Sequence, residues 1–208
     1  MTDPSFFLET PRLFLSYLQG DSDQHCDFMV ELYNSPEFIA SIGGKPTSIV
    51  TREAARRLLT NAFPGDHARN GYGTYLVSLK PAEYSIETPE DIMATLKVAT
   101  PIGTVSLMRG EEPDRYAAPD LGFAVLPAHM RKGYTKEACQ TLLKYAVTEK
   151  GVPGVFGFFN PTNEASRAVF RSLGFEDRGL HPLRIFGNEV SGVWTAPGMA
   201  ADLSIYGL

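Results

Sequence analysis

The spacing of apolar residues changes several times along the chain, and each change predicts a different element. Residues 121–126 form a short apolar run that Pro127 closes, which predicts a buried strand. Along residues 133–149 the apolar positions recur every third or fourth residue, which predicts an amphipathic helix. A strand-like run at 152–159 and a second helix at 163–174 follow. This order of strand, helix, strand and helix indicates a parallel crossover pair.

Similar patterns predict the elements on either side. We expect further strands at 8–15, 72–79, 93–99 and 102–107, and closing strands at 183–186, 190–194 and 202–206. Helices are expected around Phe28 and Tyr33 and at 51–63. Residues 80–92 form a polar excursion, which fits either a mobile hairpin or lid or a disordered insertion.

The composition is typical of one globular domain. The chain has 208 residues, of which 43% are hydrophobic, enough for one full core. No apolar run approaches the length of a membrane span, and the first residues lack the pattern of a signal peptide. We therefore expect a cytoplasmic protein, with access to the nucleus possible, and no membrane partner.

Cysteines, histidines and net charge argue against several classes of ligand. Cys26 and Cys139 are far apart and fall on predicted helices, so neither a disulfide framework nor a zinc site is indicated. The four histidines lack metal-ligand spacing, so we expect no metal. The net charge of −5 argues against nucleic acid, because binding to phosphates needs a basic face. It weakly favours a cationic substrate.

The turn between the strand at 121–126 and the helix at 133–149 is a candidate anion site. It carries Arg131 and Lys132, and Gly133 would allow an anion to approach the backbone closely. Free N–H groups and the helix dipole favour negative charge at such a helix start. A solvated basic turn, in which the glycine is only a steric necessity, explains the same residues.

With its flanks, this turn resembles the acetyl-CoA loop of the GCN5-related N-acetyltransferases, the GNAT superfamily. The pattern falls on Met130-Arg-Lys-Gly133-Tyr-Thr135, with Met130 and Thr135 departing from the usual residues at the two ends. Residues 163–175, Asn-Glu-Ala-Ser-Arg-Ala-Val-Phe-Arg-Ser-Leu-Gly-Phe, are similar to a second signature, in which Asn opens a helix and Gly-Phe closes it. Residues 8–15 look like the opening strand of the RimJ/RimL-like branch, the ribosomal-protein-alanine acetyltransferases.

The resemblance implies an α/β (α+β) fold with a single GNAT-type domain over residues 1–208. The core motifs would span about 8–180, with the polar insertion at 80–92 and closing strands at 180–208. We expect a mixed central sheet of about six to seven strands, flanked by about four helices. Its parallel fourth and fifth strands, at 121–126 and 152–159, would splay to admit the pantetheine arm of coenzyme A.

The resemblance also implies acetyl-CoA as co-substrate and places its contacts. Backbone groups of Phe123 and Val125 would pair with pantetheine, and the Val125 N–H would polarise the thioester carbonyl. Asn163 would touch the cofactor arm, and Asn160 could contribute similarly. The pyrophosphate would be held by backbone N–H groups of Arg131, Lys132, Gly133, Tyr134 and Thr135.

Catalytic groups are harder to assign from the sequence. Phe170 stands where the family often has the tyrosine that protonates the leaving thiolate, and phenylalanine cannot donate a proton. Ser166, close to the thioester in relatives of this branch, is the next candidate acid, with water as a third. Ser166 could equally well only satisfy backbone groups in the first helical turn. Asp120 is the candidate general base, although it could simply start its strand, and His129 is a fallback.

The sequence thus predicts an N-acetyltransferase that acts on a primary amine by direct attack in a ternary complex. The acceptor could be a protein N-terminus or a small molecule, and the protein a monomer or a homodimer. Because Met130, Thr135 and Phe170 depart from the family pattern, a coenzyme A-binding sensor without transferase activity is the alternative. A pure interaction module is a third.

Overall fold

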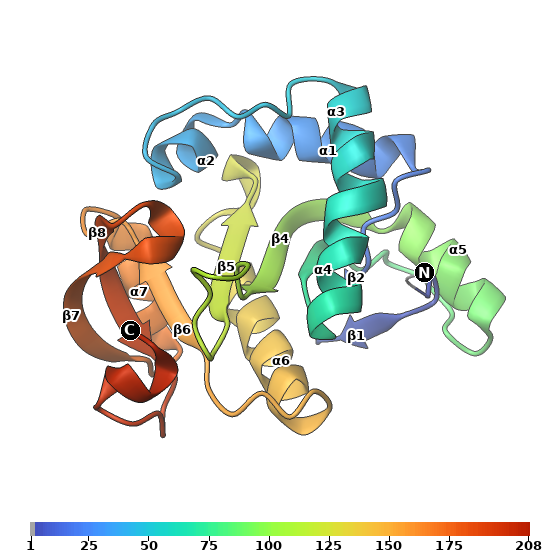
Figure 1. The fold of residues 1–208 in the computed structure, drawn as a ribbon. Coiled ribbons are helices and arrows are strands. Elements are labelled where there is room, and N and C mark those ends of the chain that lie inside the picture. The colour runs from blue at the N-terminus through green and yellow to red at the C-terminus, as the bar shows by residue number, and fades with distance from the viewer. Residues whose placement is uncertain (1–2) are drawn as a thin grey trace.

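The computed structural model describes residues 3–208 and shows an open, mixed sheet of eight strands in the order β1-β2-β3-β4-β5-β6-β8-β7 (Figure 1). The strands are β1 (Phe7–Glu9), β2 (Leu13–Ser16), β3 (Thr74–Leu79), β4 (Thr100–Met108), β5 (Asp120–Val125), β6 (Phe156–Phe159), β7 (Glu176–Leu183) and β8 (Glu189–Thr195). Within residues 3–208, β5 and β6 are the one pair of neighbouring strands that runs parallel. The predicted α/β class is confirmed, with eight strands in place of six to seven.

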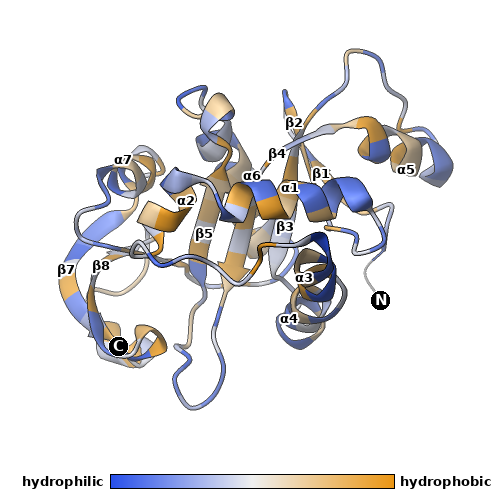
Figure 2. Cartoon of the chain, turned by 90° about the horizontal axis from the view of Figure 1, so that it is seen from above, coloured by the Kyte–Doolittle hydropathy of each residue, from blue (hydrophilic) through white to orange (hydrophobic). Residues whose placement is uncertain are grey.

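Helices cover both faces of the sheet. They are α1 (Asp23–Tyr33), α2 (Pro36–Ser41), α3 (Arg52–Arg57), α4 (Phe63–Asn70), α5 (Pro89–Val98), α6 (Tyr134–Thr148) and α7 (Glu164–Ser172). A π-helical turn, Leu58–Ala62, joins α3 to α4. Seen from above, α3 and α4 lie on one side of the strands and α7 on the other (Figure 2). Within residues 3–208, no helix has both the length and the apolar character required to cross a bilayer.

Buried side chains of residues 3–208 form three apolar clusters, two of which lie on opposite faces of the sheet at β5. On the α6 and α7 face, Leu121 and Phe123 of β5 pack with buried Leu142 and Phe170. On the opposite face, Ala124 of β5 packs against the core that α1 and α3 form. Since side chains alternate along a strand, Asp120 shares the second face with Ala124.

The segment predicted as a strand at 93–99 is instead the helix α5. Thr88 caps it: the Thr88 Oγ1 accepts from the Asp91 N–H (3.1 Å), and the Asp91 carboxylate accepts from the Thr88 N–H (3.2 Å). Pro89 occupies the first turn, where a missing N–H costs nothing. This capping box turns the end of the polar 80–92 segment into a helix start, so that part of the predicted insertion is ordered.

Both ends of the chain differ from the predicted strands. Residues 8–15 form a hairpin, because Thr10 to Arg12 make a turn between β1 and β2. At the other end, 183–186 and 202–206 are not strands: Leu183 only ends β7, and short 3-10 turns follow at Arg184–Phe186 and Leu203–Tyr206. The strand β7 itself was not expected, since its residues are mostly exposed and its apolar pattern is weak.

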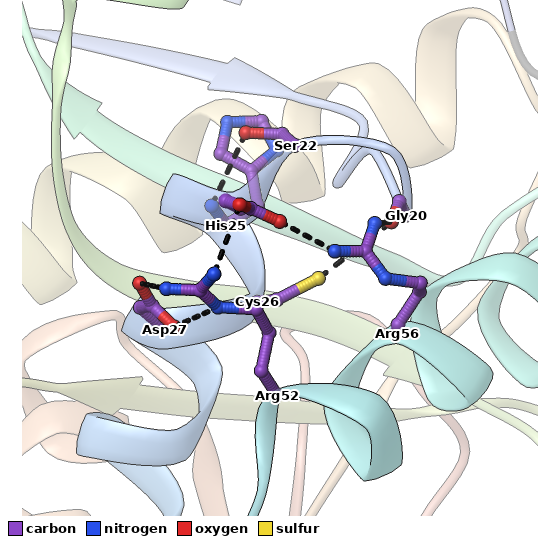
Figure 3. Close-up of polar contacts among 8 residues, drawn as sticks. Gly20, Ser22, His25, Cys26, Asp27, Arg52 and Arg56 are labelled. Atoms are coloured by element: carbon purple, nitrogen blue, oxygen red, sulfur yellow. Dashed lines mark hydrogen bonds and ion pairs between the residues drawn. The ribbon is translucent and has the colours of Figure 1, made fainter.

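Ion pairs join α1 to α3 beside the second core (Figure 3). Arg52 donates to both carboxylate oxygens of Asp27 (2.7 and 2.6 Å) and to Asp23 (2.9 Å), while Arg56 donates to Asp23 and to the Gly20 C=O. These side chains are about half exposed, so each pair contributes little stability. The pairs link α1 to the start of the long α3–α4 helix, which packs on α1 through the buried residues of the second core.

Close packing at Gly157 of β6 gives a test of the fold. A Cβ built on Gly157 would lie 2.4 Å from the ring of Phe170, which is 1% exposed. We expect Gly157→Ala to lower the free energy of unfolding by about 1–3 kcal/mol, because the buried ring must shift. Chemical denaturation measures this.

The matched control is Gly65→Ala in α4, where a Cβ meets nothing within 4 Å. It should be neutral or stabilising by up to about 1 kcal/mol. Equal stability of the two variants would contradict the packing described here.

Candidate functional site

The strands β5 and β6 meet at one point and then part. Asp120 and Phe156 are their one pair of ladder partners within residues 3–208. On the other edge of β5, the Leu126 N–H donates to the Ile102 C=O of β4 (2.8 Å). Because N–H directions alternate along a strand, the N–H groups of Phe123 and Val125 point away from β4 and into the gap. The structure therefore contains the predicted splayed strands.

The helix α6 begins beside the open end of this gap. Gly133 is its N-cap, with φ of 80°, and no side chain caps the helix. The preceding Arg131 also has positive φ, 60°. The first N–H groups of α6, those of Tyr134 and Thr135 included, therefore lack an intrahelical partner and a side-chain cap. Such a helix start favours an anion.

Hydrogen bonds from Thr10 and Arg12 to Glu137, which we call the latch, hold the start of α6 in place. They were not predicted from the sequence. The Glu137 carboxylate accepts hydrogen bonds from Thr10 Oγ1 (2.6 Å) and from the N–H and Nε–H of Arg12 (3.0 and 2.7 Å). Arg12 also donates to the Lys132 C=O (2.9 Å), and its guanidinium lies 4.5 Å from the centre of the Tyr134 ring. The turn between β1 and β2 therefore fixes the turn before α6.

The electrostatics of Glu137 match this role. Burial raises its pKa, but the hydrogen bonds from Thr10 and Arg12 outweigh burial, so the pKa lies below its usual value. Glu137 is not among the site residues predicted from the sequence. Its partners lie more than a hundred residues away along the chain, which explains why the sequence alone did not reveal them.

On the β6 side of the gap, Asn163 and Ser166 lie at the start of α7. The Asn163 Oδ1 accepts from the Ser166 N–H (3.0 Å) and so caps the helix, as predicted. The half-buried Ser166 Oγ makes no hydrogen bond within residues 3–208. Asn160 is exposed, and its side chain accepts from Thr162. Phe170 points inward, 5.4 Å from Phe123 between ring centres.

Asp120 lies at the point where β5 and β6 meet. Its residue is 7% exposed, and its carboxyl accepts no hydrogen bond from another side chain of the described residues. Burial raises its pKa to about 7, because the charged form is poorly solvated. A buried carboxyl with a pKa near neutrality is well suited to exchange protons at physiological pH.

Asp120 opens into a cavity of about 240 Å³. The end of α4, the connection between β4 and β5 and the turn between β7 and β8 form the walls. In Figure 1 this connection runs in front of β5, between α4 and the C-terminal hairpin. Its lining includes Arg69, Met108, Arg109, Ile185 and Phe186. None of these residues was singled out in the sequence, since they come from three separate segments.

The predicted site residues thus gather on two sides of one gap. Ser166 and Asn163 lie with α7 on one face, and Asp120 faces the other. His129 lies in the turn before α6 and does not line the cavity that contains Asp120. Burial and nearby Lys132 lower the pKa of His129. Within the described residues no group of three His, Cys, Asp or Glu is placed to hold a metal.

An open mixed sheet with parted parallel strands and an anion-ready helix start defines a class of acyl-transfer domains. Residues 12–176 match the family model described as the acetyltransferase (GNAT) domain. The chain belongs to this family.

Two curated relatives bear acetyltransferase names. The chain is 28% identical over 168 residues to the FsC-acetyl coenzyme A-N(2)-transacetylase of Aspergillus fumigatus, a match that covers 80% of this chain and 63% of that protein. Over 64 residues it is 33% identical to the uncharacterized N-acetyltransferase YjdG of Bacillus subtilis, covering 31% of this chain and 38% of that one. The chain thus spans less than two thirds of the length of these relatives.

Solved structures share the fold at low sequence identity. The ribosomal-protein-S5-alanine acetyltransferase of Vibrio fischeri superposes with a TM-score of 0.65 at 18% identity, covering 91% of this chain and 95% of its own. RimL, a ribosomal L7/L12 alpha-N-protein acetyltransferase in complex with coenzyme A, gives 0.66 at 16% identity, covering 91% and 97%. The RimJ/RimL-like branch expected from the sequence is therefore represented among the neighbours.

The latch at Glu137 gives a test by pH. We expect Glu137→Gln to lower the free energy of unfolding at pH 7 by about 1–3 kcal/mol, the cost of weakening charged hydrogen bonds. Because the folded-state pKa of Glu137 is lowered, its stabilisation is complete above the ordinary pKa and is lost as pH falls through the lowered one. The difference between wild type and variant should therefore shrink below about pH 4, the region of an unperturbed glutamate pKa.

Denaturation at several pH values measures this. Glu149→Gln is the control, since Glu149 is exposed at the far end of α6 and has no ion pair within the described residues. A difference that stays constant down to pH 3 would count against the latch.

Proposed function

We propose that the chain is an acyl-CoA-dependent N-acetyltransferase that moves an acetyl group from acetyl-CoA to a primary amine within a ternary complex. One observation carries the proposal: the gap between β5 and β6 has free backbone N–H groups, with an anion-ready helix start on one side and a buried carboxyl on the other. Donor and acceptor could enter from opposite faces and meet in the gap.

On the donor side, backbone groups do the binding. The pyrophosphate would lie on the N–H groups of Gly133, Tyr134 and Thr135, with Arg131 and Lys132 adding positive charge. Pantetheine would pair with β5 in place of the missing strand partner, through Phe123 and Val125. Asn163 and Ser166 would line the opposite side of the gap, at the start of α7.

Spacing along β5 sharpens the assignment of the carbonyl-binding group. Residues of a strand rise by about 3.3 Å each, which places Val125 roughly 16 Å and Phe123 roughly 10 Å along β5 from Asp120. A carbonyl held by Val125 would be too far from Asp120 for concerted proton transfer. We therefore favour the Phe123 N–H as the group that polarises the carbonyl, with one or two waters linking the amine to Asp120.

The reaction then balances as follows. Asp120 takes a proton from the ammonium group, and the neutral amine attacks the thioester carbon. The C–N bond forms, the C–S bond breaks, and the second amine proton ends on the departing thiolate of coenzyme A. Ser166 or water could deliver that proton; Phe170 is buried and cannot. A thiolate is a tolerable leaving group, so loss of this acid should cost little.

Cofactor binding separates this proposal from a pure interaction module. Calorimetry should show acetyl-CoA binding and a raised melting temperature. Thiol release with a panel of peptides, polyamines, amino sugars and arylamines then separates a transferase from a binding-only sensor. Cofactor binding without release from any amine would favour the sensor. The acceptor, the oligomeric state and a cytoplasmic location remain predictions.

Gly133 provides a test of the cofactor site. Its positive φ means that Ala there strains the backbone by about 1–2 kcal/mol and shifts the first N–H groups of α6. We expect Gly133→Ala to weaken acetyl-CoA binding at least about tenfold, which corresponds to about 1.4 kcal/mol. Isothermal titration measures the Kd.

Gly151→Ala is the matched control, because Gly151 follows the other end of α6 with φ of 62° and open space around it. It should lose similar stability and keep its affinity for acetyl-CoA. Equal affinities of the two variants would remove α6 as the pyrophosphate site.

Asp120 provides a test of the chemistry. Since a base acts in its charged form, kcat/KM should rise with pH through the Asp120 pKa of about 7. Asp120→Asn should lose this limb of the profile and lower kcat by about 10²–10⁴, the usual contribution of a general base. The Kd for acetyl-CoA should not change.

Stability shows whether the variant is folded. The raised pKa means that wild type loses stability as pH rises from the ordinary aspartate pKa toward 7, whereas the variant does not. At pH 8 Asp120→Asn should therefore melt no lower than wild type. Glu149→Gln serves again as the carboxylate-to-amide control, and full activity of Asp120→Asn would exclude Asp120 as the base.

A further inference from the structure

Among the described residues that line the Asp120 cavity, one cation has no acidic partner. Arg69 is already neutralised, since it pairs with Asp66 and with Glu111 (3.2 Å) across the cavity wall. Arg109, half-buried at the end of β4, lines the same cavity, and no carboxylate within residues 3–208 forms an ion pair with it. A cation placed in this way would be stabilised by an anion brought by a ligand.

Backbone contacts hold Arg109 in place. Its Nε–H donates to the Tyr116 C=O (3.2 Å), which ties the guanidinium to the connection between β4 and β5. A second N–H of its fork faces the Tyr72 hydroxyl, and Arg109 also borders a neighbouring cavity with Arg115 and Arg184. The outer N–H groups of the fork suit the two oxygens of a carboxylate. Arg109 directly follows Met108, which is the strand partner of Asp120. Arg109 and Asp120 are therefore close neighbours at one end of the sheet.

Between these two groups the cavity wall is apolar. Met108 and Phe186 are 46% and 43% exposed, which is high for residues of this size, and Ile185 lines the cavity beside them. The cavity therefore offers a buried acid, a fixed cation and an apolar surface in a volume of about 240 Å³. A compact ligand fits this space, and a drug-sized one does not.

We propose that this cavity takes an amine that also carries a carboxylate, an amino-acid-like acceptor whose carboxylate pairs with Arg109 and whose nitrogen points toward the gap, linked to Asp120 by water. This inference rests on the proposed transferase function and names its acceptor class. A monoanion matches the single unpaired cation. A phosphate dianion would leave excess negative charge beside Asp66, Glu111 and Asp120.

The test compares acceptors that differ only in their charge. Leucine and 5-aminopentanoate are each paired with the corresponding amide, and a short peptide amide with a free N-terminus is included. For wild type, thiol release should give a kcat/KM at least about tenfold higher for the acids than for the amides. An amide or the peptide used as well as the acids would overturn the inference and leave the transferase function intact. No release from any amine would overturn both.

Variants of Arg109 test whether this residue causes the preference for acids over amides. Arg109→Gln keeps a donor for the Tyr116 carbonyl, and Arg109→Lys keeps the charge. We expect Arg109→Gln to erase the preference through a raised KM for the acids, with kcat and the amides little changed, and Arg109→Lys to retain part of it.

Arg115→Ala is the control, because Arg115 is paired with Glu112 and does not line the Asp120 cavity. It should keep the full preference. Melting temperatures and acetyl-CoA binding report that each variant is folded. An acid preference unchanged in Arg109→Gln would overturn the role of Arg109.

Discussion

The site depends on one missing set of hydrogen bonds, those that β5 and β6 would make if they stayed paired beyond Asp120 and Phe156. Unpaired backbone groups inside a sheet are costly, so such a gap persists only where the surroundings hold it open. Here α6 and α7 pack on one face, and the buried ring of Phe170, which belongs to the core on that face, lies against Phe123 of β5 and Phe159 of β6. A ligand that hydrogen-bonds to these unpaired backbone groups therefore gains binding free energy.

The gap also explains why the two candidate proton-transfer groups lie apart. Asp120 and Ser166 are on opposite faces of the sheet, so neither could serve the other's role. A base is needed where the amine arrives, and an acid where the thiol leaves, and the gap between β5 and β6 connects the two faces. Separation of the groups is therefore what a reaction through the sheet requires, rather than evidence against it.

Sequence reasoning succeeded where local signals decide structure and failed where distant segments meet. The strand before Pro127, the helix after Gly133 and the cap at Asn163 follow from neighbours in the chain, and all three are observed. The helix α5 was missed because its apolar residues also fit a strand, and only the Thr88–Asp91 capping box distinguishes the two. The latch of Arg12 on Glu137 and the walls of the Asp120 cavity join segments far apart, so no local pattern marks them.

The two faces of the site also differ in what they recognise. In the proposed mechanism the donor side would use backbone N–H groups, whose positions depend on the fold and tolerate changes of side chain such as Met130 and Thr135 at the ends of the motif. The proposed acceptor side would use side chains from connections, including Arg109 and Phe186, which can change without disturbing the sheet. A family can therefore keep one donor while its acceptors diverge. The identity of the acceptor has to be sought in the 109–118 and 184–188 connections, and the motifs that reveal the family carry no information about it.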